Sequence, residues 1–160
     1  MTNPKPTRTR LKFALGVVVL FAVVGWFVAW PAYQRHRAIA EIERVGGHAI
    51  AGMFWFDSVV IVRLDETGID DEGLTHIGNL TELKFVNLTH TRISDAGLVH
   101  LKGMTNLKAL FLFDTKVTDA GLEHLKGMTQ LRNLYLVNTK VTDDGVKMLQ
   151  ESLPNCRIFR

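Results

Sequence analysis

Two columns of side chains with metal-binding chemistry recur every 24 residues along this chain, one with three members and one with four. Imidazole is a common zinc ligand and carboxylate a common calcium ligand, so both columns suggest a metal site. Side chains one repeat apart on successive helices are too widely spaced for one ion, and the oxygen-rich loop that calcium needs is absent. We therefore expect no metal and no cofactor. The histidines are His76, His100 and His124, and the aspartates are Asp71, Asp95, Asp119 and Asp143.

Catalytic motifs are missing from the rest of the chain. It has no HExxH, no GxSxG and no phosphate-binding glycine loop. Cys156 is the single cysteine, which excludes an internal disulfide and a multi-cysteine zinc site. It falls at an apolar position of a leucine pattern, in the second apolar slot, where a small buried hydrophobe is expected. The sequence thus predicts no catalytic residue and a protein that is not an enzyme.

The 24-residue spacing belongs to an internal repeat, in which about eight positions of each unit carry the same type of residue. A fixed period of this length predicts a solenoid, in which each unit packs only against its neighbours. In the last unit the LPNCRIF sequence restarts the pattern two residues early, so we expect a shorter final helix or loop. The units cover 59–82, 83–106, 107–130 and 131–152, with a partial fifth unit at 153–160.

Each unit begins with the pattern LxxLxL, as in Leu107, Leu110 and Leu112, which predicts a short strand buried on one face. A threonine in the next turn is expected to bond unpaired backbone groups. A capping residue, an aspartate and a leucine pair at i, i+3 then predict a short helix. The threonines are Thr67, Thr91, Thr115 and Thr139, and the expected N-caps are Asp70, Ser94, Thr118 and Thr142.

On these residues, 59–159 resembles the leucine-rich repeat family. The helix start TDxGLxxL is most similar to the cysteine-containing subclass known from F-box proteins and from bacterial envelope proteins, with threonine where that subclass often has cysteine or asparagine. The resemblance implies a curved α/β solenoid, with parallel strands on the concave face and short helices on the convex face. It also implies a protein-binding role. The chain has no F-box sequence, so a ubiquitin-adaptor role does not carry over.

An apolar run precedes the repeats. Residues 13–30, Phe13 to Trp30, carry no charge and as a helix would span about 27 Å, close to the ~30 Å hydrocarbon core of a bilayer. The bulky exit at 27–31 is a poor signal-peptidase site, so we expect an uncleaved signal-anchor helix, with a cleaved signal as the alternative. The four cations of the basic tail, 1–12, outnumber Arg35 and Arg37. The positive-inside rule then predicts a single-pass membrane protein with a cytoplasmic N-terminus and extracytoplasmic repeats.

Charge is distributed unevenly along the chain. From residue 31 onward, 15 Lys and Arg face 16 Asp and Glu, so the overall charge of +3 comes from the tail. A nucleic-acid domain carries its basic patch within the fold, so no nucleic-acid partner is expected. Between anchor and repeats, 31–58 predicts an N-terminal cap: an amphipathic helix at 33–45 ended by Gly46 and Gly47, then first strands at 48–50 and 53–56.

Outward-facing strand positions supply the candidate binding surface. Stacked in register, they predict an apolar aromatic patch beside a basic row, which is typical of a protein interface. The alternative is that Phe111 and Phe113 only flank the strand core or are covered by the N-terminal segment. The patch is Phe85, Phe111, Phe113, Tyr135 and Val137, with Phe159 at its end, and the basic row is Lys84, Lys108 and Arg132. A second basic column, Arg92, Lys116 and Lys140, is interpreted as a solvated edge.

The predicted function is a membrane-anchored leucine-rich repeat protein that binds an unidentified protein or envelope polymer through its concave face. The alternative is a structural envelope protein, a homo-oligomer formed through an open strand edge at the C-terminal end of the solenoid.

Overall fold

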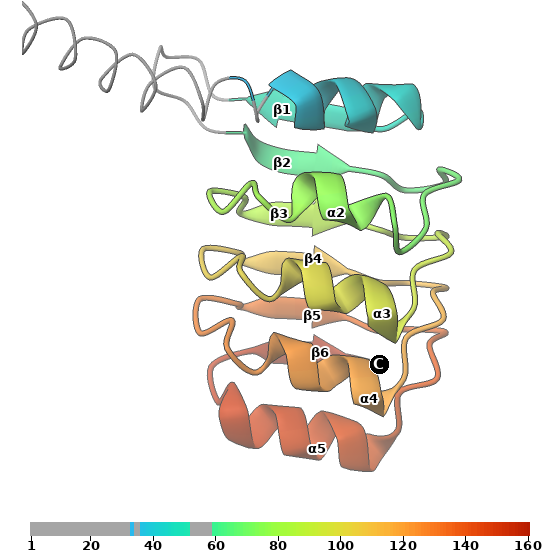
Figure 1. Cartoon of the computed structure of the whole chain (residues 1–160). Coiled ribbons are helices and arrows are strands. Elements are labelled where there is room, and N and C mark those ends of the chain that lie inside the picture. Colours follow the sequence, from blue (N-terminus) through green and yellow to red (C-terminus); the bar gives the residue numbers. More distant parts are fainter. Residues whose placement is uncertain (1–32, 34–35, 52–58) are drawn as a thin grey trace, which may run out of the picture. The chain divides into compact units, whose positions relative to one another are not determined.

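The computed structural model describes residues 33, 36–51 and 59–160 (Figure 1). The predicted tail at 1–12, the anchor at 13–30 and the strand expected at 53–56 lie outside these residues. In the described ranges no helix combines the length and apolarity needed to cross a bilayer. The chain divides into two compact units, 1–36 and 37–160, and every strand in the described ranges belongs to the second.

Six strands form one sheet in sequence order, β1 to β6. β1 pairs antiparallel with β2, and every later pair is parallel, with partners one repeat apart, as in Phe85 opposite Ala109. The α/β solenoid with a parallel sheet is therefore confirmed. The strands are β1 (His48–Ala51), β2 (Val59–Arg63), β3 (Phe85–Asn87), β4 (Ala109–Phe111), β5 (Asn133–Tyr135) and β6 (Arg157–Phe159).

Short helices cover one face of this sheet and leave the other open (Figure 1). Each returns the chain to the start of the next parallel strand, as a crossover connection must. Two of them tighten into a final 3₁₀ turn. The helices are α2 (Leu74–Ile77), α3 (Asp95–Leu98) with η1 (Val99–Leu101), α4 (Asp119–Leu122) with η2 (Glu123–Leu125), and α5 (Asp143–Ser152).

The core lies between the sheet and the helices. The inward strand residues and the helix pairs Leu98/Leu101 and Leu122/Leu125 are buried, as the pattern predicted. Met104 and Met128, in the connections from helix to strand, join them. Each turn threonine donates its hydroxyl to the carbonyl three residues earlier; Thr115 Oγ1, for example, lies 2.8 Å from Leu112 O. The expected role of the threonine column in bonding the backbone of the turn is confirmed. In the first and last of these turns the same carbonyl also accepts the threonine N–H, at 3.3 Å for Thr67 and 3.1 Å for Thr139.

The aspartate column joins one repeat to the next. Asp95 Oδ1 accepts the backbone N–H of Thr118 at 2.8 Å and Oδ2 accepts its hydroxyl at 2.7 Å. Asp119 holds Thr142 in the same way, at 2.7 and 2.6 Å, and these bonds keep the pKa of Asp119 below its usual value. Asp71 holds Ser94. We call this two-bond contact the carboxylate clamp.

The clamp has no room for a side chain on the following repeat. A Cβ added to Gly121 would overlap Asp95 Oδ1, and one added to Gly145 would overlap Asp119 Oδ1. Gly97 stands in the same relation to Asp71. The glycine of the repeat is therefore set by contact with the preceding carboxylate rather than by backbone conformation.

Helix capping agrees with prediction in three repeats and differs in the first. Ser94, Thr118 and Thr142 are N-caps whose hydroxyls accept backbone N–H groups. The prediction of Asp70 as a cap is wrong, because α2 begins only at Leu74 and its N-cap is Gly73. Asp70 instead accepts the N–H of Gly73 at 3.2 Å in the turn before the helix.

The expected frame of the last unit is also wrong. Cys156 N donates to Leu153 O as Leu131 N donates to Met128 O, so Cys156 takes the first apolar position of its repeat, not the second. The final helix is not shortened: α5, with ten residues, is longer than α2, α3 and α4. Cys156 follows Leu131 by 25 residues, one more than the repeat length. It stands one residue before β6, whereas Leu131 stands two residues before β5. The two differences cancel, so Tyr135 and Phe159 still pair one full repeat apart.

A helix over 36–44 precedes β1 and packs Ala38 and Ile42 into the core. It ends where Gly46 adopts a left-handed φ of 84°, with Gly47 N donating to Ile42 O at 2.8 Å. At the other end of the solenoid, Arg160 donates through Nε to Val141 O at 2.6 Å and pairs with Asp143. One repeat earlier, the equivalent carbonyl of Val117 accepts the N–H of Lys140, and the equivalent carboxylate of Asp119 accepts that of Thr142. Arg160 thus takes the place of both donors at the last repeat.

We expect Asp95→Ala to lower the free energy of unfolding by about 2 kcal/mol, because it removes two hydrogen bonds to a charged group. The Asp95 side chain is half-buried, so water replaces these bonds only in part. Chemical denaturation followed by circular dichroism measures the loss.

Asp144→Ala is the matched control, since Asp144 is exposed in the first turn of α5. A surface substitution of this kind should change the free energy of unfolding by no more than about 0.5 kcal/mol. Equal losses in the two variants would show that the clamp does not stabilise the fold.

Candidate functional site

The open face of the sheet presents two rows of outward side chains, because alternate residues of a strand point to opposite faces. Strand pairing sets the composition of both rows. The first contains Phe85, Ala109, Asn133 and Arg157, and the second contains Asn87, Phe111, Tyr135 and Phe159.

Three rings of the second row form a continuous stack. The ring centroids of Phe111 and Tyr135 lie 4.5 Å apart with planes at 5°, and those of Tyr135 and Phe159 lie 4.6 Å apart at 9°. Phe113 packs beside Tyr135, with ring centroids 5.5 Å apart. We call Phe111, Tyr135 and Phe159 the aromatic stack. Its spacing is the ~4.8 Å spacing of neighbouring strands, so the 24-residue repeat itself places the rings face to face.

Only some residues of the predicted patch lie together in one cluster. Phe85 lies in the first row, opposite Ala109, rather than in the stack. It is 39% exposed, and with Phe111 it lines a depression of about 200 Å³ on the sheet face. Val137 is 36% exposed and has the same position in its repeat as Phe113 has in the repeat before. Both lie in the turn after the strand, where Asp114 N donates to Val137 O. The depression is lined by Ile61, Val62, Arg63, Phe85, Val86, Asn87 and Phe111.

The basic row lies where the strands begin. Lys84, Lys108 and Arg132 are exposed and stand just before β3, β4 and β5, and Arg157 continues the row at the start of β6. None of the four belongs to an ion pair within the described part of the chain. Along β3, β4 and β5, the first-row residues Phe85, Ala109 and Asn133 lie between the basic row and the second row. Arg157 belongs to both the first row and the basic row.

Acidic groups lie at the opposite ends of the strands and are paired. Arg63 binds Asp65 through two nitrogens at 3.0 and 3.2 Å, which holds the pKa of Asp65 below its usual value. Asp114 Oδ1 accepts from Asn138 Nδ2 at 3.0 Å, and Asp114 Oδ2 lies 3.4 Å from His90 Nδ1.

The turn column at 66, 90, 114 and 138 was missed by sequence reasoning. Each of its four residues has a left-handed φ between 54° and 60°. The signal was present, because histidine, aspartate and asparagine at 90, 114 and 138 are the non-glycine residues that most often adopt this conformation.

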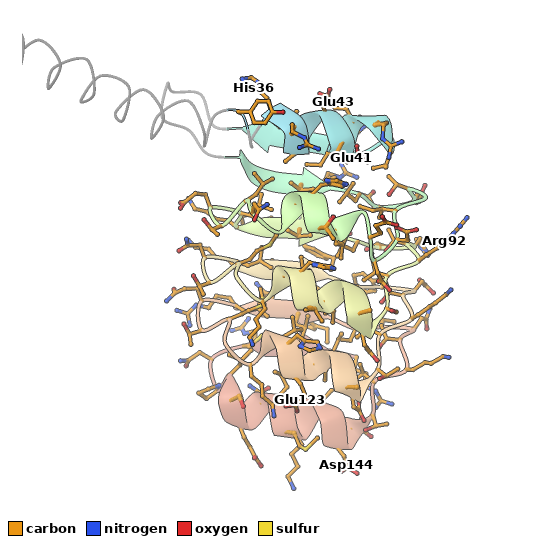
Figure 2. All side chains as sticks on the ribbon, in the orientation of Figure 1. His36, Glu41, Glu43, Arg92, Glu123 and Asp144 are labelled. Atoms are coloured by element: carbon orange, nitrogen blue, oxygen red, sulfur yellow. The ribbon has the colours of Figure 1, made fainter. Side chains whose placement is uncertain are left out.

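The second basic column forms a separate edge. The backbone N–H of Arg92, Lys116 and Lys140 donates to a carbonyl of the preceding repeat, and the side chains are exposed. Arg92 projects from this edge (Figure 2).

The histidine column lies on the helical side. His76 is exposed, and His100 and His124 are half-buried. In the described ranges no group of three or more His, Cys, Asp or Glu side chains is placed to hold a metal ion.

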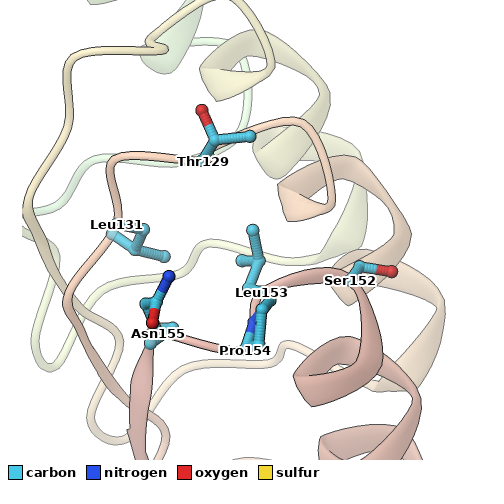
Figure 3. Close-up of a pocket in the computed structure, with 7 residues that line it drawn as sticks. Thr129, Leu131, Ser152, Leu153, Pro154 and Asn155 are labelled. Carbon is cyan, nitrogen blue, oxygen red and sulfur yellow. The ribbon is translucent and has the colours of Figure 1, made fainter.

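Cys156 is buried and lines a cavity of about 200 Å³, which is formed by the connection from α5 to β6 and by residues that precede β5. Figure 3 shows Leu153 and Asn155 of this connection facing Thr129 and Leu131 of the preceding repeat. Burial raises the pKa of the Cys156 thiol to about 11, so it is protonated at neutral pH. Only the thiolate is a strong nucleophile, so this sulfur is a weak nucleophile at neutral pH.

One segment of the chain matches a known family of repeats. A family model described as "Leucine Rich repeat" matches residues 79–101. No curated protein matches the chain. Among solved structures, the leucine-rich repeat ectodomain of the receptor kinase SOBIR1 from Arabidopsis thaliana is 16% identical over 79% of this chain and 91% of its own, with a TM-score of 0.47. An internalin (inlF) from Listeria monocytogenes str. 4b F2365 is 21% identical over 54% of this chain, with a TM-score of 0.40, and the matched part covers 30% of the internalin chain.

We expect Cys156 in the native chain to react with iodoacetamide at pH 8 about a hundredfold more slowly than in the urea-unfolded chain, because its pKa is raised from the ordinary ~8.5. The native rate should rise steeply up to about pH 11, where the thiolate forms. Mass spectrometry of timed samples measures both rates. Equal labelling of the native and unfolded chains would contradict the buried, protonated thiol.

Proposed function

We propose that this leucine-rich repeat solenoid is a binding module that recognises a protein through its open sheet face. The aromatic stack carries the proposal. Leucine-rich repeat proteins commonly mediate protein–protein binding, and the open face is where this chain departs from its own repeat. The buried positions of successive units are nearly identical, whereas the second outward position changes from Asn87 in β3 to an aromatic residue in β4 to β6.

Exposure of these rings is the physical basis of the proposal. Large apolar side chains in contact on a surface mark interfaces, and aromatic residues dominate the binding energy of most of them. Phe159 remains 41% exposed and Phe85 39% exposed. A partner covering the stack and the adjoining depression would remove this apolar area from water.

We further propose that the protein is not an enzyme and needs no cofactor. No catalytic motif occurs in the sequence, and the single thiol is protonated at neutral pH. The histidine and aspartate columns have structural surroundings: the aspartates form the carboxylate clamp and the histidines belong to the helical layer.

Self-association through the edge of β6 is the alternative proposal. β6 pairs with β5 alone among the described strands, so its other edge is open to pairing. Arg160 counts against this alternative, because it already occupies the Val141 carbonyl and the Asp143 carboxylate that a further layer would bind.

Membrane attachment completes the proposal. The apolar run at 13–30 and the excess of cations before it support a single-pass anchor with a cytoplasmic N-terminus and extracytoplasmic repeats. The partner would then be a protein at the outer surface of the membrane, with an envelope polymer as the second class of ligand.

We expect the double substitution Phe111→Ala and Tyr135→Ala to weaken binding of a captured partner by at least about tenfold, since aromatic anchors each contribute ~2 kcal/mol or more to an interface. The partner is identified by affinity capture on the full chain and mass spectrometry, and its Kd is then measured with purified proteins. Val99→Ala is the control, because Val99 is exposed at 46% on the helical side.

Unchanged affinity in the double variant, with native circular dichroism, would remove the aromatic stack from the function. A chain that self-associates at micromolar concentration in sedimentation experiments, and captures no partner, would favour the alternative instead.

We expect protease added to intact cells to digest the repeat domain, because the positive-inside rule places it outside the cytoplasmic membrane. An epitope tag placed before Met1 should remain protected until the membrane is opened with detergent. Protection of the repeats and digestion of the tag would reverse the proposed orientation.

A further inference from the structure

The charge of the open face is concentrated at one edge. Backbone N–H groups of Lys108, Arg132 and Arg157 each donate to the carbonyl of the preceding row member at 2.8 Å. Successive cations therefore stand one strand apart, at ~4.8 Å along the solenoid. All four members of the row are exposed, and they form no ion pair with any described residue.

Neighbouring positions do not neutralise this row. The residues two places earlier in three repeats are Glu82, Asn106 and Gln130, so only one of them is acidic. The other end of the strands differs, because Asp65 lies against Arg63, and Asp114 against His90 and Asn138. A partner at the basic edge therefore meets positive charge with free hydrogen-bond donors.

The aromatic stack limits which anion can bind here. Its rings cover one another face to face, at interplanar angles of 5° and 9°, so their edges point away from the sheet. Nucleic-acid bases need an open ring face to stack on, which the inner rings do not offer. Ring edges carry the positive part of the aromatic quadrupole, so they favour carboxylates as well as apolar contact.

We infer that the partner of the open face is an extended, acidic peptide segment that runs across β3 to β6. Its Asp or Glu side chains contact the row of Lys84, Lys108, Arg132 and Arg157, while its apolar side chains cover the aromatic stack and the depression beside Phe85. Alternate side chains of an extended peptide point to opposite sides, which matches a surface with cations along one side and rings along the other. This inference rests on the proposed function and names the chemistry of its partner.

The test selects phage-displayed random peptides of about twelve residues, long enough to span ~40 Å when extended, on the immobilised full chain. The expected peptides are rich in Asp and Glu alternating with aromatic or aliphatic residues. For a synthetic peptide of the selected sequence, Lys108→Glu with Arg132→Glu should weaken binding at least about tenfold, because repulsion replaces attraction. Lys116→Glu with Lys140→Glu, the same charge change at the other edge, should leave the Kd within about twofold.

Four results would overturn the inference. The first two are selected peptides without an acidic excess and no enriched peptide. The others are equal weakening by the two pairs of variants, and competition by inorganic polyphosphate as strong as by the peptide itself, which would indicate a general polyanion site. Failure here is separable from failure of the proposed function. If the Phe111→Ala and Tyr135→Ala variant loses the captured partner but the charge variants do not, the open face binds a partner that is not acidic.

Discussion

The carboxylate clamp holds each repeat at a fixed position relative to the next, and the rest of the solenoid depends on that position. One aspartate side chain accepts both the N–H and the hydroxyl of the residue that caps the following helix. The cap in turn sets where that helix begins, so the helix and the strand after it keep their register with the repeat before. The glycine two residues past each aspartate of α3 to α5 leaves the space that the preceding carboxylate occupies. Aspartate, threonine and glycine therefore recur together because they form one contact between repeats.

The strict register of the strands also brings residues from equivalent positions of successive repeats side by side on the surface of the sheet. Because partners on neighbouring strands are one repeat apart, an aromatic residue at one outward position lies directly against its counterpart in the next unit. Stacked rings and a row of cations follow from this geometry without any loop or insertion to build a pocket. The candidate site is therefore a ridge of ring edges bordered by charge, which suits recognition of another surface better than enclosure of a small molecule.

Differences between predicted and observed structure lie where local pattern and packing between repeats compete. The sequence places aspartate at the helix start, where a dipole argument suffices, but the carboxylate points to the neighbouring repeat, which is invisible in a single unit. In the last unit the leucine pattern suggests a restart at Leu153, yet strand pairing keeps Phe159 opposite Tyr135. The backbone hydrogen bonds between β5 and β6 determine the register rather than the leucine spacing. The difference in spacing is accommodated in the connection after α5.

The sequence by itself determined the period, the fold class, the buried residues and three of the helix caps, because each depends on spacing within a single repeat. It also placed Phe111 and Tyr135 at the same outward strand position, because they are one repeat apart. Tertiary structure alone decided that Phe85 stands apart from the stack, that the ring faces of Phe111 and Tyr135 cover one another, and that the aspartates bind the next repeat. These outcomes depend on the register and separation of neighbouring units, which are set when the repeats pack.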